Sequence, residues 1–507
     1  MKRLYIIYTL IILIALVMAN TVNAQYTGYS WSTAYQVVNM GTAPANIIIN
    51  YYDSSGNVIS AAQKTYTNVP IGGSRLVVQF TDDPNLPSGR YSAVISADQP
   101  IAAIANQQLV PVGASSYTPN PPFSTYSGQS EGGNSIILPS IMYNWYGYYT
   151  DVYIMNVGTT NANDVDITFT PGEIGGVPTG ASGVTDLNNT IAQYASIEKS
   201  QKNMSALGAP SGIYNGRFMG SATITADQPI IAIVNQHNEN AYKLMTYNGF
   251  TNGSNDIAVP SYMRNYFGYY TTMMIGNPSN ALTAKVTITY TPTGDYNTVS
   301  SGIVGPVTVE YEIPPMASLT RYDGPSASDD QSDLDDDPIY TRFYGSVRIT
   351  SDNPVVVQVN VEALASGDDQ AGSYNGIPVS SATQDIVVPV ILSKYYGYYT
   401  TLVVQNVTNN EGTCDITYTS DGTYSQVKNH SATYTHTLPA SGAFTVYEGN
   451  KGAAQGDINR DPTNWGVGTR FIGAATIHCT VNAVAFVNEE SDVSRRDSMY
   501  TFNTFNK

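Results

Sequence analysis

Positively charged residues are scarce in this chain. Of 507 residues, 22 are Lys or Arg against 39 Asp or Glu, which leaves a formal net charge of −17. Binding of nucleic acid requires Lys and Arg to displace the counterions of the phosphate backbone. The composition therefore predicts no nucleic-acid partner. It does not indicate disorder, because 42% of the residues are hydrophobic and 40 are Tyr.

Histidine is also scarce, and common catalytic motifs are missing from the sequence. The four His residues are scattered and form no His-Glu-x-x-His pair, and there is no Gly-x-Ser-x-Gly elbow or phosphate-binding loop. Isolated Asp and Glu could form a glycosidase pair, but the sequence singles out no two of them. We predict a protein without enzymatic activity and without a resident organic cofactor.

A long apolar run occurs only at the N-terminus. A positively charged segment, Met1-Lys-Arg3, precedes an apolar stretch at 4–18, and Val22-Asn-Ala24 fits a small-residue cleavage site. The apolar stretch is shorter than the roughly 20 residues that span a membrane. This favours a cleaved signal peptide over residues 1–24 rather than a retained anchor. We expect a secreted protein at the cell surface, with no membrane span after cleavage.

Only two cysteines are present, Cys414 and Cys479. Alternation places each on one face of a predicted strand. If both faces point into one core, an oxidising compartment would allow a disulfide. Two small buried hydrophobic residues fit the pattern equally well.

Repetition dominates the rest of the sequence. Asn144-Trp-Tyr-Gly-Tyr-Tyr-Thr150 recurs at 265–271 and 394–400, each time with an Asn nine residues after the Gly (147 to 156, 268 to 277, 397 to 406). A weaker copy leads to Asn39. The repeat-defining aromatic residues are Tyr146, Tyr148, Tyr149, Phe267, Tyr269, Tyr270, Tyr396, Tyr398 and Tyr399.

A second motif gives the same period. Asp98-Gln-Pro leads to Asn106, and its copies end at Asn235, Asn360 and Asn488, in steps of 129, 125 and 128 residues (235−106, 360−235, 488−360). A period of this length corresponds to a whole domain. We predict a signal peptide at 1–24 and repeats at 25–130, 131–253, 254–383 and 384–507.

Each repeat consists of short segments in which apolar and polar residues alternate. Turn residues separate these segments, and no sustained helical period is present. This predicts an all-β protein of four tandem antiparallel β-sandwiches, with seven to nine strands in each. We expect a turn at Asp227-Gln-Pro229, because Pro cannot donate to a central ladder. We also expect the four sandwiches to lie in line and to bury their hydrophobic faces separately.

The repeats resemble the tandem immunoglobulin-like β-sandwich repeats of prokaryotic cell-surface proteins. The resemblance rests on the aromatic-Gly-Tyr-Tyr-Thr segment, the Gly-Ser-Ala-x-Ile-x-x-Asp-Gln-Pro hairpin and a Tyr-Asn-Gly linker. It implies an immunoglobulin-like fold and supplies no catalytic residues, because such modules serve many surface functions.

Repeat 1 differs from the others at its start. Repeats 2 to 4 each have a strand before the aromatic segment, which we call the opening strand, whereas residue 25 lies only a few residues before Tyr29. The C-terminal tail, 498–507, ends where a further opening strand would begin. One hypothesis is that this tail or a neighbouring chain supplies the missing strand. The alternative is a shorter, capped edge.

Acidic residues gather in one loop before the penultimate strand. The densest cluster could bind Ca²⁺ through carboxylate oxygens, and a solvated acidic loop is the alternative. Its members are Asp329, Asp330, Asp333, Asp335, Asp336 and Asp337.

Two functions follow from these patterns. The first is a secreted, non-enzymatic structural or adhesive cell-surface protein, including assembly into an extracellular filament by strand addition. The second is a secreted carbohydrate-binding protein that uses the Tyr-Gly-Tyr-Tyr segments as aromatic platforms, against the alternative that these segments only hold each sandwich together. The expected partners are copies of the chain, other surface proteins and glycans.

Overall fold

The computed structural model describes residues 10–16, 29–111, 122–293, 306–324, 332–334, 342–363, 370–422, 424–449, 456–466, 468–491 and 499–506. These residues form an almost entirely β structure, as predicted. Helical segments are short: α1 (Gln79–Asp82), α3 (Asp457–Arg460), α4 (Pro462–Trp465), η1 (Ser60–Ala62), η2 (Gln201–Asn203), η3 (Ser205–Leu207) and η4 (Val379–Ser381).

The strands recur in the same order in each repeat. Repeat 1 contains β1 (Leu10–Leu16), β2 (Tyr29–Asn39), β3 (Ala45–Tyr52), β4 (Lys64–Val69), β5 (Ser74–Val78), β6 (Tyr91–Ala97), β7 (Ile101–Pro111) and β8 (Phe123–Ser127). Repeat 2 contains β9 (Gly133–Tyr143), β10 (Tyr149–Asn156), β11 (Ala162–Pro171), β12 (Glu173–Ile174), β13 (Val177–Pro178), β14 (Thr185–Ile191), β15 (Ser196–Ser200), β16 (Phe218–Asn238) and β17 (Lys243–Asn248).

The second half of the chain follows the same plan. Repeat 3 contains β18 (Ser254–Arg264), β19 (Tyr269–Gly276), β20 (Ala284–Pro292), β21 (Val307–Ile313), β22 (Ser318–Tyr322), β23 (Phe343–Ala363), β24 (Ala371–Asn375) and β25 (Ile377–Pro378). Repeat 4 contains β26 (Thr383–Ser393), β27 (Tyr398–Asn406), β28 (Gly412–Ser420), β29 (Ser431–Leu438), β30 (Ala443–Tyr447), β31 (Phe471–Ser491), β32 (Tyr500–Asn503) and β33 (Phe505–Asn506).

One long strand joins the two sheets of each later repeat. In repeat 1 the sheets are separate, with orders β1-β6-β3-β4 and β5-β2-β7-β8. In repeat 2, β16 pairs with β11 up to Thr225 and with β10 from Ile230 onward. The turn predicted at Asp227-Gln-Pro229 is therefore wrong in repeat 2. The strand passes Pro229 without ending because it changes its pairing partner there, so no continuous ladder needs the missing N–H.

The Asn that ends the first motif explains why the motif recurs. Asn156 is fully buried, and its Nδ2 donates to Thr160 O (2.8 Å) and Ile191 O (3.0 Å). Its Oδ1 accepts from Gly158 N at 2.8 Å. The other three copies make the same set of bonds to their own loops, from Asn39, Asn277 and Asn406.

Replacing Asn156 with Ala is expected to destabilise repeat 2 by about 3 kcal/mol, because it removes three hydrogen bonds to backbone groups, two of which are buried. Urea unfolding measures the loss. Asn163→Ala, an exposed position beside the same loop, is the matched control. Equal midpoints for the two variants would show that the Asn side chain does not hold the loop.

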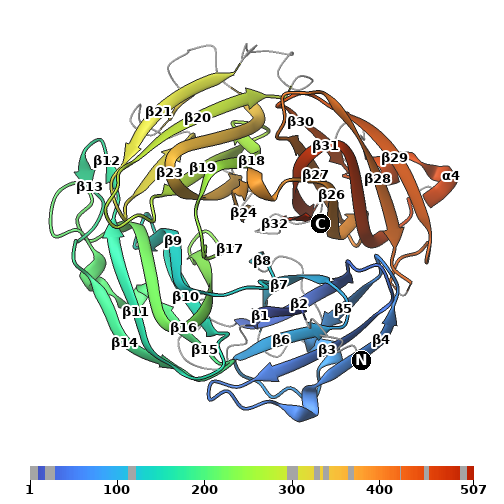
Figure 1. The fold of residues 1–507 in the computed structure, drawn as a ribbon, viewed down its shortest axis with the longest axis horizontal. Helices are drawn as coiled ribbons and strands as arrows, with labels where there is room; N and C mark the ends of the chain where they lie inside the picture. Colours follow the sequence, from blue (N-terminus) through green and yellow to red (C-terminus); the bar gives the residue numbers. More distant parts are fainter. Residues whose placement is uncertain are drawn as a thin grey trace, which may run out of the picture.

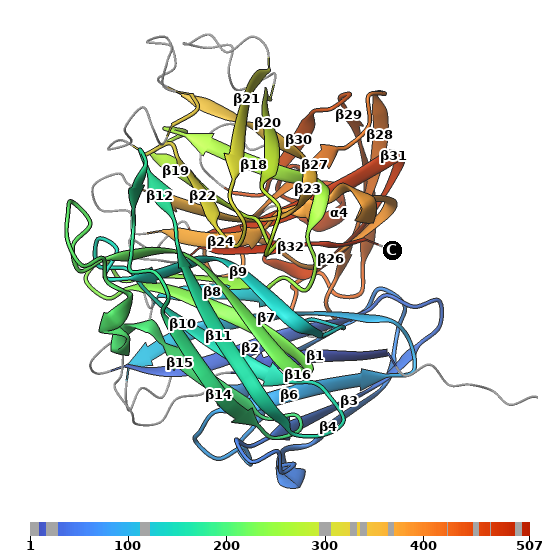
Figure 2. The same cartoon turned by 60° about the vertical axis from the view of Figure 1, so that its left-hand side comes forward.

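The four sandwiches close into a ring rather than lying in line (Figure 1). Four strands lie at the centre, and we call them the axial strands: β8, β17, β24 and β32, which pair with β7, β16, β23 and β31. Each axial strand contacts the next, and β32 contacts β8. The turned view shows the same packing of repeat against repeat (Figure 2). The expectation of a linear array is therefore wrong.

Ring closure also means that the cores are shared between neighbours. In β16, Ile230, Ala232 and Val234 belong to the core of repeat 2, whereas Ile231 and Ile233 pack into the core of repeat 1. A strand buried on both faces has a continuous hydrophobic run instead of alternation. Separate burial of each hydrophobic face, as expected from the period, is therefore wrong.

Candidate functional site

The aromatic-Gly-Tyr-Tyr segments form tight hairpin turns. In repeat 2, the backbone N–H groups of Trp145 and Tyr148 each donate to the other residue's carbonyl, at 3.0 and 2.9 Å. The two residues between them, Tyr146 and Gly147, have φ of 50° and 88°. Positive φ at both central positions defines a type I′ turn, which favours Asn-Gly. The same bonds and φ signs recur at 266–269 and 395–398.

The first central residue of each turn is a bulky, exposed aromatic. Tyr146, Phe267 and Tyr396 are 64%, 70% and 66% exposed. A residue other than Gly in the left-handed region costs about 1–2 kcal/mol. Stability alone would favour Asn or Gly here and would bury an aromatic ring. Strain of this kind points toward function rather than packing.

Each exposed ring lies against an arginine. The guanidinium carbons of Arg217, Arg342 and Arg470 lie 4.3, 4.0 and 4.5 Å from the ring centroids of Tyr146, Phe267 and Tyr396. Each Arg directly precedes the long strand of its repeat, so the sandwich scaffold positions the cation. We call these three ring-and-guanidinium pairs the aromatic–arginine tips.

Tyr148, Tyr269 and Tyr398, the next aromatic residues of the motif, contact the neighbouring repeat. Tyr148 OH donates to Glu362 Oε2 of the next repeat at 2.6 Å, and Tyr269 OH donates to Glu490 Oε2 at 3.0 Å. The ring of Tyr398 lies 6.2 Å from that of Phe123 in repeat 1. The second Tyr of each Tyr-Tyr pair forms a hydrogen bond within its own repeat: Tyr149 to Asn144, Tyr270 to Asn265 and Tyr399 to Glu490.

The axial strands form a ladder of side-chain amides. Asn503 Nδ2 donates to Asn375 O at 2.6 Å, Asn375 to Asn248 O at 2.8 Å, and Asn248 to Ser127 O at 2.7 Å. Ser127 has a hydroxyl and no side-chain amide, so it cannot continue the ladder toward repeat 4 in the same way. A cavity of about 170 Å³ lies among these strands.

A second set of polar contacts joins neighbouring repeats. In each contact, the Gln that directly follows the second-motif Asn of one repeat bonds to the second-motif Asn of the next repeat. Gln107 and Asn235 exchange hydrogen bonds of 3.1 and 3.2 Å across the seam between repeats 1 and 2. Asn360 donates to Gln236 at 2.6 Å across the next seam. The equivalent residue in repeat 4 is Glu489, which lies opposite Thr400 of β27 and Tyr500 of the axial strand β32.

Glu489 is a buried acid. It is 2% exposed, and its Oε1 has no hydrogen-bond partner among the described residues. Burial raises the pKa of Glu489 to about 8. Burial likewise raises the pKa of Glu448, in the same repeat, to about 7.

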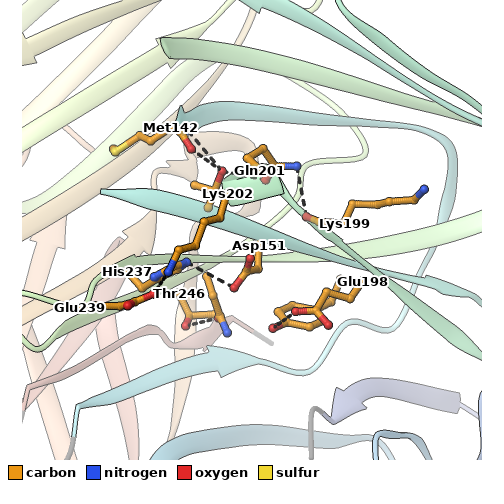
Figure 3. Close-up of polar contacts among 12 residues, drawn as sticks. Met142, Asp151, Glu198, Lys199, Gln201, Lys202, His237, Glu239 and Thr246 are labelled. Atoms are coloured by element: carbon orange, nitrogen blue, oxygen red, sulfur yellow. Dashed lines mark hydrogen bonds and ion pairs between the residues drawn. The ribbon is translucent and has the colours of Figure 1, made fainter. Parts of the chain in front are cut away.

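Repeat 2 contains a buried acid–base pair, shown in Figure 3. His237 Nε2 lies 3.4 Å from Asp151 Oδ2, and both side chains are at most 1% exposed. The ring of Tyr149 stacks on His237 at 6.1 Å. The pair is not among the residues that line the axial cavity. Since both groups are sealed from solvent, the arrangement supports packing rather than proton transfer to a substrate.

The acidic loop supplies acceptors for buried tyrosines, which the sequence analysis missed. Tyr51 OH donates to Asp83 at 2.7 Å, Tyr418 OH donates to Asp457 at 2.9 Å, and Tyr290 OH donates to Asp333. In repeat 2 the equivalent core residue is Phe169, and the loop from 199 to 217 contains no Asp or Glu. The core Tyr and the loop Asp are thus present together in repeats 1, 3 and 4 and absent together from repeat 2, so this pairing could have been inferred from the sequence.

The predicted calcium cluster lies mostly outside the described residues, namely Asp329, Asp330, Asp335, Asp336 and Asp337. Asp333 is described, and its carboxylate is occupied by Arg321 NH2 at 2.5 Å and Tyr311 OH at 2.5 Å. These partners leave Asp333 poorly placed to bind a cation. Within the described ranges, no group of three His, Cys, Asp or Glu residues is arranged to hold a metal.

Cys414 and Cys479 form a disulfide. The sequence alone is compatible with either a disulfide or two free, buried cysteines. They lie directly opposite each other on β28 and β31, and both are fully buried. Among the described residues, no helix is both long and apolar enough to cross a membrane.

Comparison with known proteins identifies no family. No family model matches the chain, and no curated protein matches it. A solved structure titled "Crystal Structure of Thermotoga maritima 1070" matches at 24% identity, covering 25% of this chain and 95% of that chain, with a TM-score of 0.19. A TM-score this low carries no argument about fold or function.

Proposed function

We propose that this chain is an exported, non-enzymatic adhesive protein of the cell surface, which contacts carbohydrate through its three aromatic–arginine tips. The observation that carries the proposal is the exposure of Tyr146, Phe267 and Tyr396 on strained turns. An exposed ring offers an apolar face to a sugar ring, and an adjacent guanidinium donates to hydroxyl or carboxylate oxygens.

The arrangement of the repeats supports attachment rather than reach. A closed ring of four sandwiches adds little length (Figure 1), but it presents several equivalent tips on one rigid body. Weak sites on one body reinforce each other, so that avidity exceeds single-site affinity by roughly 10²–10⁴-fold. Export remains part of the proposal, supported by the predicted signal peptide and the disulfide. The immunoglobulin-like classification of the sandwiches is also part of the proposal and is supported by the motif resemblance.

The proposal predicts that the triple variant Tyr146→Ala/Phe267→Ala/Tyr396→Ala binds glycans at least about a hundredfold more weakly, because avidity is lost with the three rings. A single variant should lose less. Glycan arrays and pull-down on insoluble polysaccharides measure both effects.

The matched control removes three exposed aliphatic side chains elsewhere, with Ile71→Ala/Leu187→Ala/Leu282→Ala, at positions 58%, 51% and 57% exposed. This variant should bind like the parent chain. Equal losses in both triple variants would show that general surface hydrophobicity, and not the tips, holds the glycan.

A further inference from the structure

The opening strands of repeats 2 to 4 complete their sandwich cores in one shared register. Ile136 lies opposite Ile224, Ile257 opposite Ile349, and Ile386 opposite Ile477. Two residues later come Leu138, Val259 and Val388. All six opening-strand residues are at most 2% exposed. Each repeat therefore depends on this strand to close its core.

In repeat 1 the same position is taken by β1, although no opening strand is expected there from the sequence. Ile12 lies opposite Ile95 and Ile14 opposite Ala93, and these partners occupy the positions of Ile224 and Ala222 in repeat 2. The register is identical to that of the other opening strands. Yet β1 lies within the predicted signal peptide, so cleavage after residue 24 would leave β6 as an open edge.

The edge that cleavage exposes lacks the usual protection. β6 has the sequence Tyr-Ser-Ala-Val-Ile-Ser-Ala, with no charge and no Pro. Free edges in native proteins are normally blunted by Lys, Pro or bulges. An unprotected edge beside an incomplete core is an acceptor for an extended chain.

The C-terminal tail does not fill this slot, which corrects one hypothesis of the sequence analysis. β32 pairs with β31, and β33 pairs with β26, both within repeat 4. The three opening strands that match β1 are likewise paired within their own repeats. Within the described part of the chain, a second copy therefore has no such strand to give.

We propose that repeat 1 of the exported chain is a strand-acceptor site, which binds an extended apolar segment of a different polypeptide along β6. The segment that fits has about seven residues with aliphatic side chains at alternate positions, as β1 itself has. This inference rests on the proposed export, because the site opens only when residues 1–24 are removed.

The test uses chain 25–507 and a synthetic peptide of residues 10–16 with two lysines added at each end for solubility. Calorimetric titration should show saturable one-to-one binding, and the peptide should raise the melting temperature. A peptide with Ile12→Asp and Ile14→Asp should bind at least about a hundredfold more weakly, because it would bury two unpaired carboxylates. The uncleaved chain 1–507 should not bind. Equal binding of the two peptides, or binding to the uncleaved chain, would overturn the proposal.

A second measurement covers the case in which chain 25–507 does not fold. In the uncleaved chain, Ile12→Asp/Ile14→Asp should lower hydrogen-exchange protection of residues 91–97 at least tenfold, while leaving β23 of repeat 3, whose core contains no residue of repeat 1, unchanged. Unaltered protection would contradict the role of this slot. Concentration-dependent oligomers of chain 25–507 that the peptide dissolves would overturn the assignment to a different polypeptide. Glycan binding on the same preparations reports separately on the tips.

Discussion

Replacing Glu489 with Gln is expected to make the protein's stability independent of pH above about pH 7. Unfolded, this carboxyl ionises near 4.5, whereas burial raises its folded pKa to about 8. Between these values the unfolded state has released a proton that the folded state keeps, so stability falls as pH rises and stops falling above about pH 8. For a fully buried group, the total loss is on the order of a few kcal/mol.

Glu448 makes the test sharper. Burial raises its folded pKa to about 7, so its contribution to the pH dependence ends one unit earlier. Urea unfolding across pH 5 to 9 should show the parent chain losing stability up to about pH 8, and Glu489→Gln losing it only up to about pH 7. Gln occupies the equivalent position in repeats 1 and 2, at Gln107 and Gln236, so the fold accommodates Gln there. Glu411→Gln, at an exposed loop position, should leave the parent profile unchanged. A Glu489→Gln profile identical to the parent's would show that this carboxyl does not titrate in the folded state.

Reducing the disulfide is expected to cost about 4 kcal/mol, because its loss frees a loop with a sequence separation of 65 residues in the unfolded chain. Trp465 is fully buried in the same core as Cys414 and Cys479, so its fluorescence reports on repeat 4. A Trp31→Phe/Trp145→Phe background isolates that emission, and urea unfolding with and without dithiothreitol measures the effect.

The variant Cys414→Ala/Cys479→Ala separates the bridge from the reductant. It should be destabilised by at least as much as the reduced parent chain, since each Ala also leaves space in the core. It should then show no further response to dithiothreitol. A parent chain whose repeat 4 unfolds at the same urea concentration in both conditions would contradict a stabilising bridge.

The local pattern of the sequence determined the class of structure. Alternation of apolar and polar residues predicts strands whatever the neighbours are, because side chains in a strand point to opposite faces in turn. Recurrence of the two motifs predicts one module used four times. The buried Asn of each first motif shows why that Asn is kept, since its side chain holds loops of its own repeat.

The tertiary structure decided how the modules meet. Ring closure depends on which outer sheet face is covered by a neighbour, and a repeat period carries no information about that. The run Ile230-Ile-Ala-Ile-Val234 did carry it, because only a strand buried on both faces needs apolar residues at every position. Pairing of Cys414 with Cys479, and of the loop acids with core tyrosines, depends on register between strands far apart in sequence. Alternation assigns a side chain to a face, whereas packing between distant segments selects the residue opposite it.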